Sequence, residues 1–125
     1  MDEAAKCVLV DDDEDFLTIA HRLLRRACPD LQVIDFLSGN DALEYLAAYG
    51  ADLVITDCRM PIMDGFEMVS AVRVFDPEVP ILMMSNEENL EGEALSRGAT
   101  IFLPKRSLFT ELAATLERLG IHARS

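Results

Sequence analysis

The chain has 125 residues, enough for one domain around a single hydrophobic core, and half of its residues are apolar. It carries 23 acidic against 11 basic residues, and the resulting net charge of −12 disfavours binding to a nucleic-acid backbone. No apolar run approaches a membrane span and the acidic N-terminus lacks a signal peptide's apolar segment, so we expect a cytoplasmic protein that binds no membrane. Three widely spaced cysteines favour reduced thiols over a disulfide framework.

Strand and helix patterns alternate from the start of the chain. Residues 6–10 form a short, continuous apolar run, which is typical of a strand covered on both faces. Apolar residues then recur at helical spacing over residues 16–27, and a proline two positions later ends this helix. Residues 32–37 alternate as a second strand. Ser38 or Asn40 can cap the helix that follows, and a glycine ends it.

The second half of the chain continues this alternation. Residues 52–57 predict a buried strand that ends on an acid, and a helix over residues 66–75 follows after a turn. Residues 80–84 predict a fourth strand, followed by a helix over residues 89–97 that an internal glycine weakens. Residues 100–103 predict the fifth strand.

The last predicted helix is amphipathic, spans residues 107–119 with Ser107 as its cap, and leaves a short C-terminal tail. Five strand-then-helix units with short loops predict an α/β fold, with a five-stranded parallel sheet and helices on both faces. No linker or repeat interrupts the pattern, so residues 1–125 are predicted to form a single domain.

Five acids follow the first predicted strand, in the segment VLVDDDEDF. They repel one another by roughly 1 kcal/mol per close pair even in water, so a bound cation would stabilise them. In parallel α/β folds the ligand site lies beyond the carboxyl ends of the strands, which brings together Asp11, Asp12, Asp13, Asp57, Ser85 and Lys105. Grouped carboxylates suit Mg²⁺. A carboxylate beside such an ion, an ammonium and a hydroxyl can attack phosphorus and form an aspartyl phosphate.

Four segments in order, VLVDDDED, VITDCRMPIMDG, ILMMSN and IFLPK, resemble the receiver domain of two-component response regulators. The resemblance covers nearly the whole chain, and its most specific piece is the D-x-x-M-P-x-x-D-G pattern that begins at Asp57. It implies a flavodoxin-like (βα)5 fold with strand order 2-1-3-4-5. It also implies a protein that accepts phosphate from a phosphohistidine, carried by a sensor histidine kinase or a histidine phosphotransfer protein.

The resemblance assigns roles to the acidic residues. It implies that Asp57 is the phosphoacceptor. Asp11, Asp12, Asp57 and the main-chain carbonyl of Arg59 are implied to hold Mg²⁺, for which Mn²⁺ is an alternative. Apart from its own Mg²⁺-dependent phosphorylation and dephosphorylation, the chain is expected to catalyse no reaction.

The resemblance also implies how the signal is read. Ser85 is the switch hydroxyl, Lys105 binds the phosphate, and Phe102 matches an aromatic residue that swings inward on activation. A downstream protein or a fused output domain is expected to read the face formed by residues 89–119, through which a homodimer is also conceivable.

Three departures from the family pattern affect details of the site. Most receiver domains have proline after the lysine, whereas Arg106 follows it here and Pro104 precedes it. The family's lysine–proline bond is generally cis, and without proline the cis form costs roughly 2.5–4 kcal/mol, so we predict a trans peptide before Arg106. Asn86 stands where a small residue is usual, and it shields the site, points to solvent or caps the following loop. Arg59 and Glu87 occupy lifetime-tuning positions in the family and are predicted to pair.

Each assigned residue also has a simpler interpretation. Asp13, Glu14 and Asp15 are best explained by the positive N-terminus of the first helix, and Asp11 and Asp12 are alternative caps for it. The remaining simple alternatives are a turn at Asp57, an ordinary hydroxyl at Ser85, a solvated lysine at Lys105, a fixed core aromatic at Phe102 and inert packing at Cys58.

The leading functional hypothesis is therefore a phosphorylation-dependent signalling switch of a phosphorelay. A magnesium phosphohydrolase with an aspartyl nucleophile is the enzymatic alternative, but the chain has no insertion long enough for a substrate cap. A degenerate receiver domain that only binds partners is the third possibility, and the complete set of acids, hydroxyl and lysine argues against it.

Overall fold

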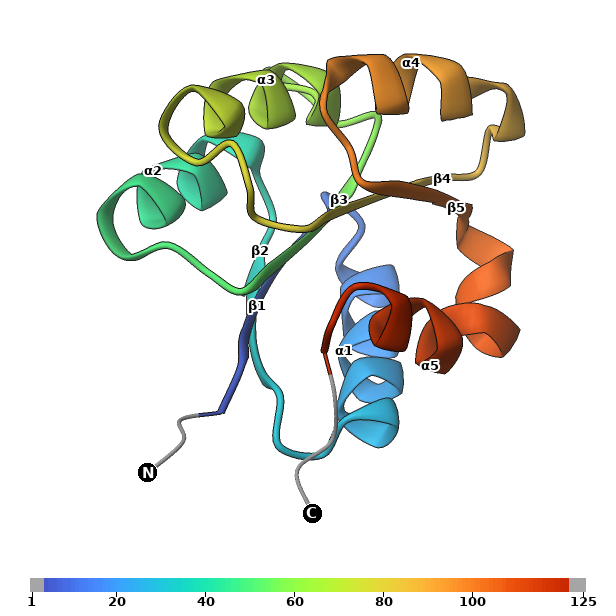
Figure 1. Cartoon of the computed structure of the whole chain (residues 1–125). Helices are drawn as coiled ribbons and strands as arrows, with labels where there is room; N and C mark the ends of the chain where they lie inside the picture. The colour runs from blue at the N-terminus through green and yellow to red at the C-terminus, as the bar shows by residue number, and fades with distance from the viewer. Residues whose placement is uncertain (1–3, 122–125) are drawn as a thin grey trace.

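The computed structural model describes residues 4–121 as a five-stranded parallel sheet with helices on both faces (Figure 1). The strand order is β2-β1-β3-β4-β5, which confirms the predicted fold. The chain order therefore reverses between β1 and β3, where Val10 lies opposite Thr56. The strands are β1 (Lys6–Val10), β2 (Gln32–Phe36), β3 (Leu53–Asp57), β4 (Ile81–Ser85) and β5 (Ile101–Pro104).

Helices α2, α3 and α4 cover one face of the sheet, and α1 and α5 cover the other (Figure 1). Their bounds are α1 (Glu14–Ala27), α2 (Gly39–Tyr49), α3 (Gly65–Phe75), α4 (Glu91–Arg97) and α5 (Leu108–Arg118), with short 3-10 turns at η1 (Glu88–Leu90) and η2 (Lys105–Ser107). Within the described part of the chain, the helices are too short or too polar to cross a membrane.

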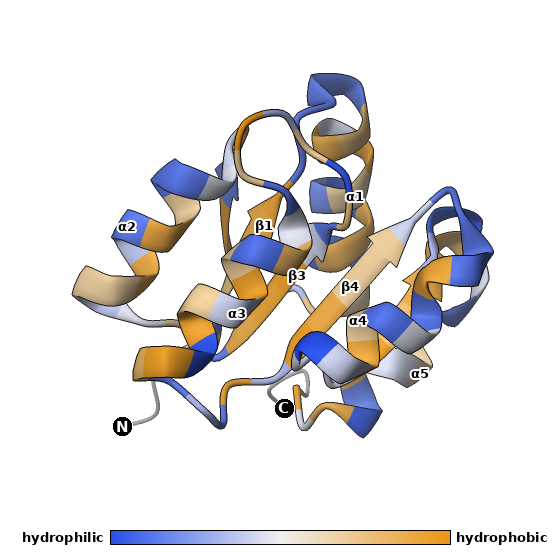
Figure 2. Cartoon of the chain, turned by 90° about the horizontal axis from the view of Figure 1, so that it is seen from above, coloured by the Kyte–Doolittle hydropathy of each residue, from blue (hydrophilic) through white to orange (hydrophobic). Residues whose placement is uncertain are grey.

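Two apolar clusters fill the space between the sheet and its two helical layers. Val8 and Val10 belong to the cluster beneath α2, α3 and α4, whereas Cys7 and Leu9 belong to the cluster beneath α1 and α5. Successive side chains of a strand point to opposite faces, so a strand covered on both sides must be apolar throughout. Figure 2 shows this in the hydrophobic colouring of β1, β3 and β4, which explains the uninterrupted apolar runs of the sequence.

Polar side chains begin three of the helices. Asp13 caps α1, where its Oδ1 accepts hydrogen bonds from the amides of Asp15 and Phe16. Ser38, rather than Asn40, caps α2. At α3, Asp64 and the third helical residue form a reciprocal capping box, and such caps stabilise a helix by about 1 kcal/mol.

The prediction that Ser107 caps the last helix is wrong. The 3-10 turn η2 carries the chain directly from β5 into α5, so Ser107 already has helical dihedral angles of −72° and −15° and makes no side-chain capping bond. The helix spans Leu108–Arg118, so it begins directly after the predicted cap position and ends one residue before the predicted end. The predicted C-terminal tail falls mostly on residues 122–125, which lie outside the described range.

The peptide bond before Arg106 is trans, as predicted, since residues 4–121 contain no cis peptide. The three cysteines are buried and free, which confirms that they do not form disulfides with one another. Cys58 follows the predicted phosphoacceptor directly, and burial followed by the neighbouring Asp57 charge raises the pKa of its thiol to about 12. This cysteine is therefore protonated and packed in the core, as its simpler interpretation states.

Candidate functional site

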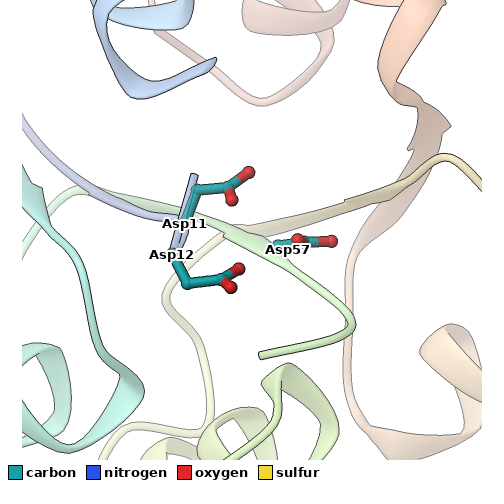
Figure 3. A group of neighbouring side chains, drawn as sticks. All are labelled: Asp11, Asp12 and Asp57. Atoms are coloured by element: carbon teal, nitrogen blue, oxygen red, sulfur yellow. The ribbon is translucent and has the colours of Figure 1, made fainter. Parts of the chain in front are cut away.

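Three carboxylates gather where β1 and β3 end (Figure 3). Asp11 and Asp12 directly follow β1, and Asp57 is the last residue of β3. Each offers a carboxylate oxygen, and these oxygens lie within 4.8 Å of one another. Asp11 is 0% and Asp57 7% exposed, whereas Asp12 is open to solvent. The sheet thus assembles two buried acids and one accessible acid at the predicted place.

Lys105 brings a cation to the same site from the end of β5. Its Nζ lies 2.8 Å from Oδ2 of Asp11 and 3.3 Å from Oδ2 of Asp57. The residue is 8% exposed, and its ammonium sits 4.4 Å from the centre of the Phe16 ring. A lysine this buried is held by its charge partners rather than by solvent. The simpler interpretation of Lys105 as a solvated surface lysine is therefore wrong.

Burial and mutual repulsion shape the ionisation of these groups. Burial, and then the Asp11 carboxylate, raise the pKa of Asp57 to about 6. Burial likewise raises the pKa of Asp11, against the opposing effect of Lys105. Burial alone would lower the pKa of Lys105, but the two carboxylates outweigh it and raise that pKa above its usual value. With three carboxylates facing one ammonium, a further cation would stabilise the ionised site.

The residues present fit a magnesium ion. Within residues 4–121, Oδ2 of Asp11 is a buried oxygen without a hydrogen bond of favourable geometry, although the Lys105 ammonium is close. The donor set is entirely carboxylate oxygen, which suits a hard divalent cation better than zinc. Asp12 leaves one side of the group open to solvent. A role for the main-chain carbonyl of Arg59 as a further ligand stays a prediction.

Ser85 ends β4 and is 2% exposed. Met84 lies opposite Asp57, so Ser85 stands one residue beyond the predicted phosphoacceptor on the neighbouring strand. Its Oγ accepts a hydrogen bond from the amide of Glu87 at 3.0 Å. Ser85 is therefore at the edge of the acidic group, and its hydroxyl is engaged with its own loop.

Arg59, Asn86 and Glu87 flank Asp57 and Ser85 in the sequence and are exposed. Nε of Arg59 donates to Oε2 of Glu87 at 3.2 Å, which confirms the predicted pair. Asn86, between the serine and this glutamate, is exposed. Phe102 is buried in the cluster beneath α2, α3 and α4, opposite Met83 of the neighbouring strand. Its inward movement on activation stays a prediction.

Asp13, Glu14 and Asp15 follow their simpler interpretation. Asp13 caps α1, and the other two are exposed acids in the first helical turn. Asp11 also contributes locally, because its Oδ1 accepts a hydrogen bond from the amide of Asp13 at 2.9 Å. Asp13, the third of the five consecutive acids, thus caps α1, and Asp12 is not needed as a cap.

Two features of the site were missed by sequence reasoning. The helical pattern accounts for Phe16 only as an apolar residue of the first helix, although its ring also faces the ammonium of Lys105. The family pattern marks Arg106 only as a departure from proline, and it does not predict the ion pair of Arg106 with Glu88 at 2.8 Å. Neither contact has a periodic signal, because each joins residues far apart in the chain.

Comparison with known proteins agrees with this geometry. A family model described as the response regulator receiver domain matches residues 7–117. The transcriptional regulatory protein ZraR of Escherichia coli (strain K12) is 36% identical over 120 residues, which are 94% of this chain and 27% of that protein. The chain therefore spans about a quarter of the length of this curated relative.

Solved structures show the same fold. Chemotaxis protein CheY4 of Vibrio cholerae matches with a TM-score of 0.82 and 33% identity, over 92% of this chain and 98% of that one. The signal receiver domain of the response regulator NarL from Mycobacterium tuberculosis matches with a TM-score of 0.83 and 32% identity, over 95% and 98% of the two chains. The chain belongs to the family of response regulator receiver domains.

Proposed function

We propose that this chain is a phosphorylation-dependent switch whose Asp57 accepts a phosphoryl group from a phosphohistidine, carried by a sensor histidine kinase or a histidine phosphotransfer protein. The observation that supports this most directly is the contact of one buried lysine with two buried carboxylates from neighbouring strands. Family membership itself implies phosphorylation-dependent signalling.

In the proposed reaction, a carboxylate oxygen of Asp57 attacks the phosphorus, the bond from phosphorus to the histidine nitrogen breaks, and that nitrogen keeps the electron pair. Asp11, Asp12, Asp57 and the main-chain carbonyl of Arg59 would hold Mg²⁺. Bound Mg²⁺ supplies positive charge that offsets the charge on the transferring phosphoryl oxygens. Lys105, which directly follows β5, adds a second positive charge.

The phosphoryl group adds nearly two negative charges and strong acceptor oxygens beside Asp57. We propose that these draw in the hydroxyl of Ser85 and the ammonium of Lys105, with Phe102 moving inward behind the serine. The change would then reach the face formed by α4, β5 and α5. A downstream protein, a fused output domain or a second copy of the chain is the proposed reader of that face.

The proposed setting is the cytoplasm. The relative ZraR is a transcriptional regulatory protein of which this chain spans only a part, so any output acts through sequence outside the chain or through a separate partner. With its net charge of −12, the chain itself is not proposed to bind nucleic acid or membrane.

Phosphate incorporation from labelled acetyl phosphate, with and without Mg²⁺, tests the proposed function. A switch should incorporate up to one phosphoryl group per chain in the presence of Mg²⁺ and little without it. A phosphohydrolase would turn over many substrate molecules per chain, and a degenerate receiver domain would incorporate no label under either condition.

Mg²⁺ should stabilise the fold, because clustered carboxylates repel one another and an ion that binds only the folded state favours it. The gain should be about 2.7 kcal/mol at a hundredfold excess of Mg²⁺ over its Kd. Asp12→Asn should remove most of this gain, since it deletes the accessible carboxylate of the group. Urea unfolding with and without millimolar Mg²⁺ measures the difference.

Asp13→Asn is the matched control for this experiment. It deletes the adjacent negative charge, but asparagine is as good a helix cap as aspartate, so α1 should keep its first turn. We expect this variant to retain the full response to Mg²⁺. If millimolar Mg²⁺ does not change the unfolding midpoint of the parent protein, the metal assignment is wrong.

The phosphorylated form should be long-lived, because hydrolysis requires a water molecule in line with the phosphorus at roughly 3–3.5 Å. Asn86 is proposed to crowd this approach from one side, and the pair formed by Arg59 and Glu87 is proposed to restrict it from another. Asn86→Ala should therefore speed the loss of phosphate by about threefold, or roughly 0.7 kcal/mol in the barrier. Decay of labelled protein after removal of the donor gives the rate.

Asn89→Ala serves as the control for Asn86→Ala, since it removes another exposed asparagine side chain three residues further along the loop. Its decay rate should equal that of the parent protein. Equal or slower decay in Asn86→Ala would mean that this side chain points to solvent and does not guard the site.

A further inference from the structure

The loop between β4 and α4 carries two consecutive glutamates, each of which pairs with an arginine from a different segment of the chain. Glu87 pairs with Arg59, which lies two residues after the phosphoacceptor position. Glu88 pairs with Arg106, whose Nη1 lies 2.8 Å from Oε2 of the glutamate. Both arginines follow residues of the candidate site closely in the chain, so the loop is connected to two sides of the site at once.

The Arg106–Glu88 pair joins two segments that carry different parts of the site. Arg106 directly follows Lys105, whose ammonium contacts two carboxylates, and both belong to η2. Glu88 opens η1, three residues after Ser85. The pair therefore links the turn that positions the lysine to the loop that positions the serine hydroxyl.

The two side chains influence each other's ionisation. The Glu88 carboxylate raises the pKa of Arg106, and the guanidinium lowers the pKa of Glu88. Both side chains are mainly exposed, at 67% and 59%, so the pair should add little to folding stability. The pair can instead affect the position of the loop, because even a small free-energy difference between two loop positions changes their relative populations severalfold.

We propose that Arg106 is a positioning residue, which acts through Glu88 to hold the β4–α4 loop in the described position and so opposes its movement toward a phosphoryl group. This inference rests on the proposed function, in which the hydroxyl of Ser85 is drawn toward Asp57. In the described arrangement that hydroxyl is engaged with the amide of Glu87, within the same loop. A contact present in one arrangement and weakened in the other shifts the equilibrium toward the first.

The test is the binding of beryllofluoride, an analogue of the phosphoryl group, measured with Mg²⁺ present. Arg106→Ala and Glu88→Gln should each bind it about two- to fivefold more tightly than the parent protein, because the loop is then freer to move. The double variant should bind no more tightly than either single variant. Exchanging the charges, with Arg106→Glu and Glu88→Arg together, should restore parental binding.

Glu93→Gln is the matched control, because it removes a similar exposed pair, with Arg97, that lies entirely within α4. It should leave beryllofluoride binding unchanged. A second measurement needs neither Mg²⁺ nor the analogue: amide hydrogen exchange over residues 86–90 should be faster in Arg106→Ala and in Glu88→Gln, and about 1 M salt should reduce the difference.

The outcomes separate this inference from the proposed function. A parent protein that binds no beryllofluoride and incorporates no label would overturn both. A parent protein that binds it normally, with variants that bind equally or more weakly, would overturn the positioning role of Arg106 and leave the switch intact. Tighter binding in the single variants with additive effects in the double variant would also overturn it, since the two residues would then act separately.

Discussion

Asp57→Asn should abolish labelling by acetyl phosphate, because an amide is a far poorer nucleophile toward phosphorus than a carboxylate. The fold should survive the change. Burial and the Asp11 charge disfavour the ionised form of Asp57, so a neutral side chain of the same shape is tolerated there. The stoichiometry of incorporated phosphate, together with an unfolding curve of the same sample, measures both effects.

Asp64→Asn is the matched control for the loss of labelling. Asp64 is an acid on the same loop, but it caps α3, and asparagine can replace it in that role. This variant should label like the parent protein. If Asp57→Asn keeps the parental stoichiometry instead, the phosphoacceptor lies elsewhere, and Asp11 and Asp12 are the first residues to examine.

Gly65→Ala should destabilise the protein by about 3 kcal/mol and reduce labelling as well. A Cβ atom at this position would overlap the carbonyl oxygen of Asp57 and crowd the backbone of Cys58. These neighbours are main-chain atoms at the end of β3, so the clash can be relieved only by moving the strand end that carries Asp57, the proposed phosphoacceptor. Urea unfolding and phosphate incorporation give the two effects.

Gly92→Ala is the opposite case and the control for Gly65→Ala. A Cβ atom at Gly92 would have no heavy atom within 4 Å among the described residues, and its φ is not left-handed. Alanine is favoured over glycine in a helix by up to about 1 kcal/mol, so this variant should be slightly more stable than the parent protein. Equal losses of folding stability in both variants would show that the close approach of α3 to β3 is not the cause of the destabilisation by Gly65→Ala.

The order of the elements and the members of the acidic site follow from patterns that are visible in the sequence. Strands buried on both faces must be apolar throughout, and amphipathic helices repeat their apolar residues at helical spacing, so both leave local patterns. Acids placed at the end of one such strand and directly after another, with a lysine after a third, meet because parallel strands end at one edge of the sheet. The segments around Asp57 and Lys105 then carried the family resemblance, and the structure assembles that group of residues.

The contacts of exposed and turn residues were decided only by the tertiary structure. The partner of Arg106 depends on where the loop after β4 passes, and no local pattern encodes that path. Ser107 looked like a helix cap, but the end of β5 leads straight into a 3-10 turn that makes a cap unnecessary. His21 contacts Asp35 at 3.0 Å because α1 packs beside β2, although neither residue belongs to a motif. Local sequence preferences do not distinguish between the possible contact partners of such side chains. Long-range packing therefore decides which contacts form.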